Sequence, residues 1–215
     1  CKINKISILA DPHCTYKEFG NRVGAESFRS WFTASPEIFY PRESERKYDI
    51  GFSGALHGSG KIEGPTRDLR TRIQAILKSN NSYNTFWNGS DSVTTRIKDV
   101  SEYSAKINEC KIWLSTTGPM LDIGPRYFEV LLSKTLLFCN NMPKQYDGTF
   151  IDGENCVMFE NDLSNFEEKL KYYLCNEDER NLVATRGYNM AKDEYTWKHM
   201  AMKLLDEVRK VGNTK

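Results

Sequence analysis

Short apolar runs alternate with helical stretches over most of the chain, which is the pattern of an α/β protein with a mainly parallel sheet. Strands are predicted at 6–11, 30–33, 48–54, 83–87, 111–114, around Leu136 and at 155–159. Helices are predicted from Pro65, from Asp99 or Ser101 through Ile107, around Glu129, and over 163–174, 177–189 and 195–209. The order of these elements predicts a doubly wound sheet.

Two segments set the expected domain organisation. The helix that begins at Pro65 carries a core stripe at helical spacing, formed by Leu69, Ile73, Ile76 and Leu77. The segment 36–47 combines prolines with dense mixed charge and is predicted to be a linker. We therefore expect a short N-terminal strand and linker region over 1–47 and a Rossmann-like domain over 48–215.

Composition narrows the class of protein. The 215 residues carry a net charge of +1, and hydrophobic content of 39% with charged content of 27% fits a soluble globular protein. No global field is available to attract nucleic acid or an anionic membrane, and no apolar run reaches membrane-spanning length. The six cysteines form no CxxC pair, which favours a reducing, cytoplasmic location. Because the chain begins at Cys1, we expect it to belong to a larger multidomain polypeptide.

Ligands of doubly wound sheets bind beyond the carboxyl ends of the strands, where three polar loops are expected at 54–64, 88–95 and 115–125. The first loop is not a P-loop, because five residues separate Gly54 from Gly60-Lys61 and Ile62 follows the lysine. Arg67 and Arg70 follow it one helical turn apart and could share a face. From spacing alone, Arg67 and Arg70 fit equally well as part of a solvated helix surface.

The segment Gly124-Pro125-Arg126-Tyr127-Phe128-Glu129 predicts a loop that leads into a helix, with an arginine and a carboxylate at the mouth. Free amides at a helix start, together with the planar donor fork of Arg126, suit a phosphate group. Glu129 lies one turn further on, where it could accept hydrogen bonds from a ribose diol. The alternative is an amphipathic helix with Arg126 and Glu129 on its solvated face.

Asp11-Pro12-His13 closes the first predicted strand, and a carboxylate beside an imidazole could act as base and orienter. The alternative is a turn in which Asp11 binds backbone amides. His57 and His199 are not at metal-ligand spacing, and no HExxH or DxD sequence occurs. Metal-dependent catalysis is therefore disfavoured.

Several segments together resemble the nucleotide-binding half of GT-B-type glycosyltransferases of group 1. The resemblance covers about residues 48–212, and its motifs are Tyr48-Asp49-Ile50-Gly51-Phe52-Ser53-Gly54, Arg126-Tyr127-Phe128-Glu129 and Phe150-Ile151-Asp152-Gly153-Glu154-Asn155. It implies that the 48–215 region is the nucleotide-sugar-binding domain of a GT-B fold. It also implies that residues 1–47 are a short extension, a remnant of the acceptor side.

The resemblance also implies roles for individual residues. Glu129 would hold the donor ribose, and the loop before it would wrap the diphosphate. The donor-binding set is then Gly54, His57, Arg67, Arg70, Ile97, Thr117, Gly118, Arg126, Tyr127 and Glu129. Relatives carry a second glutamate where this chain has Leu121, with Asp122 beside it, so donor-sugar contacts and the stereochemical outcome are left open.

The function that follows is transfer of a hexosyl or deoxyhexosyl group from a nucleotide-diphosphate sugar, with UDP suggested by the resemblance alone, to a glycan hydroxyl. No metal and no cofactor are expected, and Asp11 and His13 are the candidate catalytic base. An alternative is a non-catalytic nucleotide- or sugar-binding module of a larger polypeptide. A nucleotide-sugar epimerase or reductase is disfavoured, because the GxGxxG fingerprint is absent.

Overall fold

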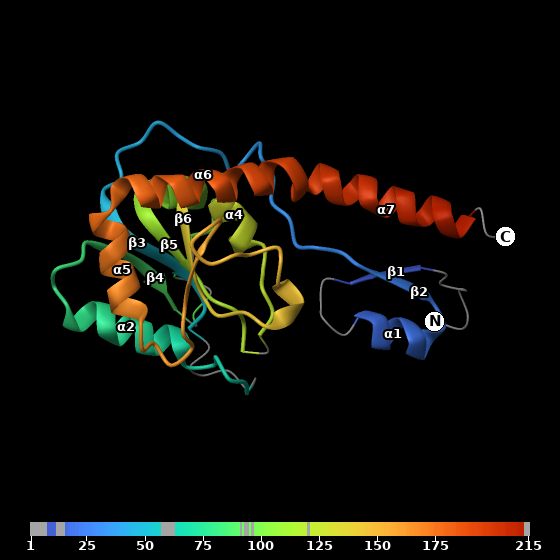
Figure 1. The fold of residues 1–215 in the computed structure, drawn as a ribbon, viewed down its shortest axis with the longest axis horizontal. Coiled ribbons are helices and arrows are strands. Elements are labelled where there is room, and N and C mark those ends of the chain that lie inside the picture. The colour runs from blue at the N-terminus through green and yellow to red at the C-terminus, as the bar shows by residue number, and fades with distance from the viewer. Residues whose placement is uncertain are drawn as a thin grey trace.

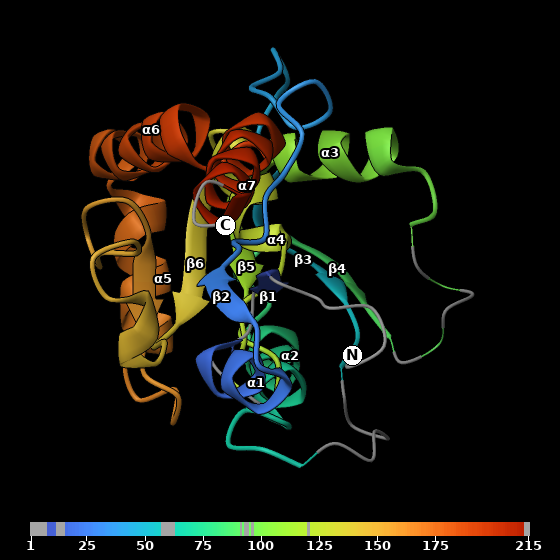
Figure 2. The same cartoon turned by 90° about the vertical axis from the view of Figure 1, so that its right-hand side faces the viewer.

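A five-stranded parallel sheet forms the centre of the molecule (Figures 1 and 2). The computed structural model describes residues 8–11, 16–56, 63–90, 92, 95, 97–119 and 121–212. Across the sheet the strand order is β4-β3-β5-β6-β7, and every pairing is parallel. The strands are β3 (Tyr48–Gly54), β4 (Thr85–Gly89), β5 (Cys110–Ser115), β6 (Leu136–Asn140) and β7 (Val157–Phe159). The predicted doubly wound α/β fold is confirmed.

Helices cover both faces of this sheet and bury two apolar clusters. On one face, α2 (Leu69–Ser79) and α5 (Phe166–Cys175) pack on side chains such as Phe52 and Phe138. On the other face, α3 (Val100–Asn108) and α4 (Arg126–Leu132) pack around Trp113. The helix α6 (Glu177–Glu194) contacts both α4 and α5. The alternation of apolar strands and helices in the sequence therefore produces buried strands between two helical layers.

The N-terminal region differs from its prediction. The second strand is β2 (Glu26–Arg29), and the helix α1 (Tyr16–Val23), which the sequence pattern did not predict, joins it to β1 (Ile8–Asp11) in a separate two-stranded parallel sheet. The predicted strand at 30–33 is wrong, because this apolar run is irregular. Its Trp31 instead packs against three aromatic rings of the main domain, those of Phe128, Tyr146 and Tyr195.

The predicted linker at 36–47 is irregular, as expected, but it is fixed to the main domain. Phe39 is buried, and the Arg42 amide donates a hydrogen bond of 2.9 Å to Oδ1 of Asn108. Asn108 is fully buried and also donates to the carbonyl oxygens of Tyr40 and Ser104. The segment therefore makes specific contacts to α3 that its charged composition did not indicate.

Two arginines lie where the strands begin, at what we call the amino edge of the sheet. Arg46 donates to the carbonyl oxygens of Ile107, Cys110 and Lys134 and to the Thr135 hydroxyl. Arg180 donates to the carbonyls of Tyr173 (2.8 Å) and Leu174 (3.2 Å), at the end of α5. Burial lowers the pKa of Arg46. Cations suit these positions because the last carbonyls of a helix lack intrahelical partners and carry the negative end of its dipole.

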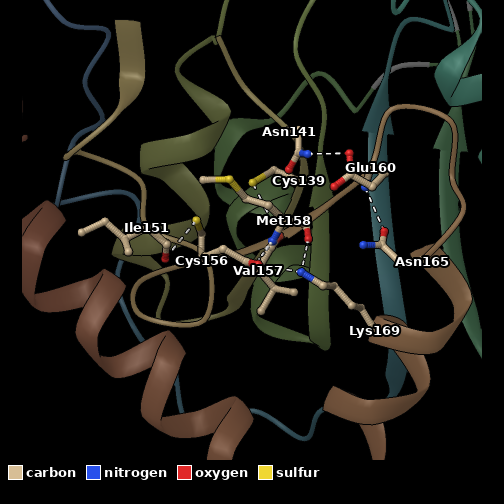
Figure 3. A network of polar contacts seen from close by, with 10 residues as sticks. Cys139, Asn141, Ile151, Cys156, Val157, Met158, Glu160, Asn165 and Lys169 are labelled. Atoms are coloured by element: carbon tan, nitrogen blue, oxygen red, sulfur yellow. Dashed lines mark hydrogen bonds and ion pairs between the residues drawn. The ribbon is translucent and has the colours of Figure 1, made fainter. Parts of the chain in front are cut away.

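Side chains hold the short edge strand β7 in place (Figure 3). Lys169 donates to the Asp152 carboxylate and to the Met158 carbonyl, both at 2.6 Å, and Asp152 accepts from the Met158 amide at 2.7 Å. The buried thiols of Cys139 and Cys156 donate to nearby carbonyl oxygens. Burial raises the pKa of the Cys139 thiol, so it packs as a neutral group.

The chain leaves the main domain at two places that lie side by side. Ala34 and Thr196 form an isolated parallel bridge, and α7 (Trp197–Gly212) follows directly. The Glu37 carboxylate accepts from Ser35 and from Nε1 of Trp197, and it pairs with Lys198 at 2.9 Å. Beyond this point α7 extends alongside the small β1–β2 sheet (Figure 1). No helix in the described part of the chain is both long and apolar enough to cross a membrane.

Candidate functional site

A cavity of about 540 Å³ opens where the strands end, at what we call the carboxyl edge of the sheet. This volume lies within the range typical of small-molecule sites. The ends of β3 and β5, the helices α2 and α3 and the start of α4 all contribute to it. Its lining residues are Phe52, Ala55, Arg70, Tyr103, Ser115, Thr116, Gly118, Asp122, Ile123, Gly124, Pro125, Arg126, Tyr127 and Glu129.

Arg70 brings a buried cation to this cavity, with a side chain only 7% exposed. Its Nε donates to the Thr116 hydroxyl at 2.7 Å, and its Nη1 donates to the Ala55 carbonyl at 2.6 Å. Its Nη2 donates to the Thr116 carbonyl at 3.2 Å, and the guanidinium lies over the Phe52 ring. These contacts fix the orientation of a charge that faces the cavity.

Arg126 supplies a second guanidinium from the start of α4. Its guanidinium lies against the backbone of Gly54, the last residue of β3, so closely that a Cβ at position 54 would collide with Nη1. Gly54 also has a φ of 156°, which side-chain-bearing residues rarely adopt. Glycine at this position therefore allows the Arg126 guanidinium to lie over the end of the strand.

Glu129 lies one turn along α4 and also lines the cavity. Burial raises its pKa, while the charge of Arg126 and the hydroxyl of Tyr103 offset part of that rise. The Tyr103 hydroxyl, which comes from α3, lies close enough to this carboxylate to affect its pKa. The geometry between the two groups does not meet the criteria for a hydrogen bond. Burial raises the pKa of Tyr103 in turn, so it remains a neutral donor.

Four buried side-chain oxygens of cavity-lining residues have no hydrogen-bond partner among the described residues. They are the hydroxyls of Tyr103, Ser115 and Tyr127 and the Oδ1 atom of Asp122. Buried polar groups in native proteins are almost always paired, so each exception needs a physical reason. Their concentration around one cavity indicates a site built for a polar ligand.

The loop after β5 presents Asp122 through a tight turn. The Gly118 amide donates to the Asp122 carbonyl at 2.8 Å, and the Leu121 amide donates to the Gly118 carbonyl at 2.9 Å. Leu121 has a φ of 64°, an uncommon conformation for a residue with a side chain. Residues held in this way cluster at ligand sites, which agrees with the position of Asp122 at the cavity.

The structure corrects the expectation of free amides at the mouth of α4. The Tyr127 amide donates to the Gly124 carbonyl at 3.3 Å, and the amides of Phe128 and Glu129 donate to the Pro125 carbonyl at 2.9 and 3.0 Å. The turn before the helix therefore satisfies these amides. Positive charge at the cavity comes from the two arginines instead.

Five of the predicted donor-binding residues line the cavity, namely Arg70, Gly118, Arg126, Tyr127 and Glu129. Gly54 touches Arg126 beside it. Thr117 follows Thr116 but directs its amide and hydroxyl to Asn140. Arg67 forms an ion pair with Glu63, and Ile97 lies half-buried before α3, so the structure places neither in the cavity lining.

The catalytic candidates lie elsewhere or are not described. Asp11 is the last residue of β1, in the separate two-stranded sheet. His13 and His57 lie outside the described residues. Within the described ranges, no group of three His, Cys, Asp or Glu side chains is arranged to hold a metal ion.

Sequence reasoning did not assign Tyr103, Ser115, Thr116 or Asp122 to the site. Ser115 and Thr116 belong to the loop that was expected at the carboxyl edge, which is a usable signal. Asp122 is adjacent to the Leu121 position noted in the resemblance. Tyr103 had no signal, because only the packing of α3 brings its hydroxyl to the cavity.

The chain belongs to the glycosyl transferase-like family, whose model matches residues 50–206. A search among curated protein sequences found no match.

Solved structures share the fold at low sequence identity. Sucrose-phosphate synthase from Thermosynechococcus elongatus aligns with a TM-score of 0.65 at 10% identity, covering 97% of this chain and 59% of that one. HepE from Anabaena in complex with UDP-glucose aligns with a TM-score of 0.66 at 9% identity, covering 95% and 64%. The C-terminal domain of a group 1 glycosyl transferase from Francisella tularensis aligns at 0.51 and 17% identity, covering 76% and 99%.

The resemblance to the nucleotide-binding half of GT-B glycosyltransferases is thereby confirmed. The chain spans less than two thirds of the length of the synthase and of HepE.

Proposed function

We propose that the cavity binds a nucleotide-diphosphate sugar and that the protein transfers its sugar to a glycan hydroxyl. One observation carries the proposal: two guanidiniums, two carboxylates and a set of buried oxygens without partners in the described ranges line the same cavity at the carboxyl edge. Such a ligand combines a diphosphate with two groups rich in hydroxyls. A non-polar ligand would leave all of these oxygens unpaired, and a simple anion would leave the Asp122 Oδ1 atom unpaired, because both are acceptors.

The diphosphate belongs between Arg70 and Arg126 in this proposal. A guanidinium presents parallel donors that match phosphate oxygens, and the fixed orientation of Arg70 reduces the entropy lost on binding. Two such charges can stabilise a leaving diphosphate without a metal ion. The metal-independent site expected from the sequence therefore remains our proposal.

The hydroxyl groups of the ligand belong at the two carboxylates. Glu129 would accept hydrogen bonds from the ribose, and Asp122, whose Oδ1 has no partner among the residues that the structure describes, would accept from the transferred sugar. UDP is our choice of nucleotide, supported by the structural likeness to HepE, whose structure was determined in complex with UDP-glucose. A hexose or deoxyhexose is our choice of donor sugar.

In the proposed reaction the oxygen of an acceptor hydroxyl attacks the anomeric carbon of the donor sugar. The bond between that carbon and the diphosphate oxygen breaks, and its electron pair leaves with the diphosphate. A base accepts the proton of the attacking hydroxyl. Asp11 and His13 remain our candidates for that base.

A non-catalytic binding module is the alternative, and one observation favours it. The described lining contains no histidine, and the proposal uses both of its carboxylates, Asp122 and Glu129, to bind the donor. For the enzyme, the Asp11→Asn variant separates a catalytic role of Asp11 from a structural one. A catalytic Asp11 predicts unchanged UDP affinity and melting temperature with loss of transfer, whereas a structural Asp11 predicts a lower melting temperature with unchanged transfer per folded molecule.

Calorimetry with UDP, GDP and dTDP in EDTA tests the binding proposal. We expect UDP to bind without added metal and to raise the melting temperature by mass action. Arg72→Ala is the matched control for Arg70→Ala. Both residues are on α2, but Arg72 is exposed and donates to the Asp162 carbonyl. Loss of UDP binding in EDTA, restored by manganese, would overturn metal independence. Absence of binding to any nucleoside diphosphate would overturn the site itself.

A further inference from the structure

A buried asparagine lies behind the cavity, at the end of β6. Asn140 is fully buried, and its Oδ1 accepts from the Thr117 amide at 2.8 Å. Its Nδ2 donates to the Thr117 hydroxyl at 3.0 Å, to Oδ1 of Asn161 at 2.8 Å and to the Asn141 carbonyl at 3.1 Å. One side chain thus connects the loops that follow β5, β6 and β7.

Asn140 holds Thr117 at two points, its amide and its hydroxyl. The residue before it, Thr116, provides both the hydroxyl and the carbonyl that orient the Arg70 guanidinium. Only one peptide unit separates the Asn140 contact from the Arg70 contact. A shift of Thr117 would therefore move the acceptors of Arg70.

A second tie fixes the same loop from the other side. The Thr66 hydroxyl donates to the Gly118 carbonyl at 2.7 Å. The backbone of Gly64 lies so close to the Pro119 carbonyl that any Cβ at position 64 would collide with it. The segment 116–118 is therefore held between the turn that precedes α2 and the end of β6, and Arg70 donates to Thr116 within it.

We propose that Asn140 is a positioning residue for Arg70, acting through Thr117 and Thr116, and does not itself contact the donor. This inference rests on the proposed diphosphate role of Arg70. It also reassigns Thr117, which the sequence analysis placed among the donor contacts, to the link that holds the arginine. An amide side chain suits the position, because it accepts from one backbone amide and donates to two side-chain oxygens.

Asn108 offers a matched control in the same domain. It is equally buried, its Oδ1 accepts from the Arg42 amide at 2.9 Å, and its Nδ2 donates to the carbonyls of Tyr40 and Ser104. It lies at the end of α3 and outside the cavity lining. Loss of its amide removes a similar set of buried hydrogen bonds without touching the Thr116–Arg70 contact.

The experiment compares Asn140→Ala with Asn108→Ala by two measurements below the melting temperature of both variants. The first is the solvent exchange rate of the Arg70 Nε proton, observed by NMR and assigned with Arg70→Lys. The second is the dissociation constant for UDP. We expect Asn140→Ala to accelerate the exchange and to weaken UDP binding, each by about tenfold or more, because small displacements of a positioning group are costly. Asn108→Ala should lower the melting temperature and change neither quantity.

The two measurements separate the inference from the proposed function. If wild type binds no UDP, the proposed function fails, and the exchange rate alone still decides whether Asn140 orients Arg70. Equal exchange rates in Asn140→Ala and Asn108→Ala would overturn the inference. If Asn140→Ala does not fold, Thr117→Val breaks the hydroxyl end of the same contact and Thr117→Ser restores it. Identical exchange in those two variants would equally overturn the inference.

Discussion

Both edges of the sheet bury an arginine, but the arginine at the amino edge binds the end of a helix, whereas the arginine at the carboxyl edge faces a cavity. At the amino edge, Arg180 is 5% exposed and donates to the last carbonyls of α5. At the carboxyl edge, Arg70 is 7% exposed and faces a cavity whose lining includes four oxygens that no described residue pairs with. Burial of a charge therefore does not identify a binding site by itself. The unpartnered acceptors and donors around the charge make the distinction.

The largest expected effect comes from removing each of these two arginines. Arg70→Ala should weaken UDP binding by about 2–5 kcal/mol, the usual cost of truncating a buried hydrogen-bonded charge at an interface. Arg180→Ala should leave UDP binding unchanged and lower the free energy of unfolding by about 1–3 kcal/mol, because it leaves buried carbonyls unsatisfied. Calorimetry and chemical denaturation measure the two quantities. Loss of UDP affinity in Arg180→Ala would remove the contrast between the edges.

Glu129→Ala is the next test, and it concerns the carboxyl edge alone. We expect UDP binding to weaken by about 1–3 kcal/mol, the range for a lost hydrogen bond to a charged group. The fold should survive, because Glu129 lines the cavity and adds no apolar side chain to the core. A calorimetric titration beside a thermal melt checks both points. Wild-type affinity in Glu129→Ala would exclude the ribose role.

Two hydroxyl-bearing residues, Thr135 and Tyr127, each 1% exposed, extend the comparison. At the amino edge, the Thr135 hydroxyl accepts from Arg46 and donates to the Ile107 carbonyl, so Thr135→Val should destabilise the protein by about 1 kcal/mol or more. At the carboxyl edge, the Tyr127 hydroxyl has no partner in the described part of the chain, so Tyr127→Phe should stabilise the ligand-free protein by up to about 1 kcal/mol.

Denaturant unfolding without ligand measures both changes. Destabilisation by Tyr127→Phe would show that this hydroxyl is already paired in the free protein, contrary to its assignment to a ligand.

The smallest expected effect is a pH dependence from Glu129. Burial raises the pKa of this carboxyl above its ordinary value of 4.5, so the unfolded chain loses the proton first as pH rises. Stability should fall from about pH 4.5 through the higher folded pKa. The difference in unfolding free energy between Glu129→Gln and wild type should therefore be more favourable to the variant at pH 7 than at pH 4. Unfolding curves at the two pH values measure this gain.

Tyr103→Phe checks the cause of that pH dependence. The Tyr103 hydroxyl lowers the pKa of Glu129, so its removal should extend the loss of stability to higher pH. A pH profile of Tyr103→Phe identical to that of wild type would show that the hydroxyl has no influence on the carboxylate.

The sequence pattern predicted the central fold well, because buried parallel strands leave apolar runs that are hard to mistake. The prediction of 48–54 as a strand matches β3, and Leu69, Ile73 and Leu77 of the predicted stripe are buried. The pattern failed for α1 and β2, which form a small unit apart from the central sheet. The pattern of apolar and polar residues is clearest in elements that pack on a large hydrophobic core.

Only those site residues that lie close together in the sequence could be predicted. Arg126 and Glu129 share one helix turn with a recognisable motif, so they could be identified directly. Tyr103 reaches the cavity through helix packing, and Asp122 reaches it through the left-handed conformation of Leu121. Arg46 belongs to the predicted linker at 36–47, and the sequence pattern could not reveal its contacts, because the helix ends that it binds are distant in sequence. Contacts of this kind become visible only in three dimensions.

The paired crossing at Ala34 and Thr196 has a mechanical consequence. Two chain segments joined side by side resist relative twisting more than a single tether would, so the bridge stiffens the connection to the small sheet and α7. Hydrogen bonds from Ser35, Lys198 and Trp197 lower the pKa of Glu37 to about 2, so the carboxylate that clamps the crossing stays charged in mild acid. The crossing thus joins a surface carboxylate to two buried residues, Ala34 and Thr196.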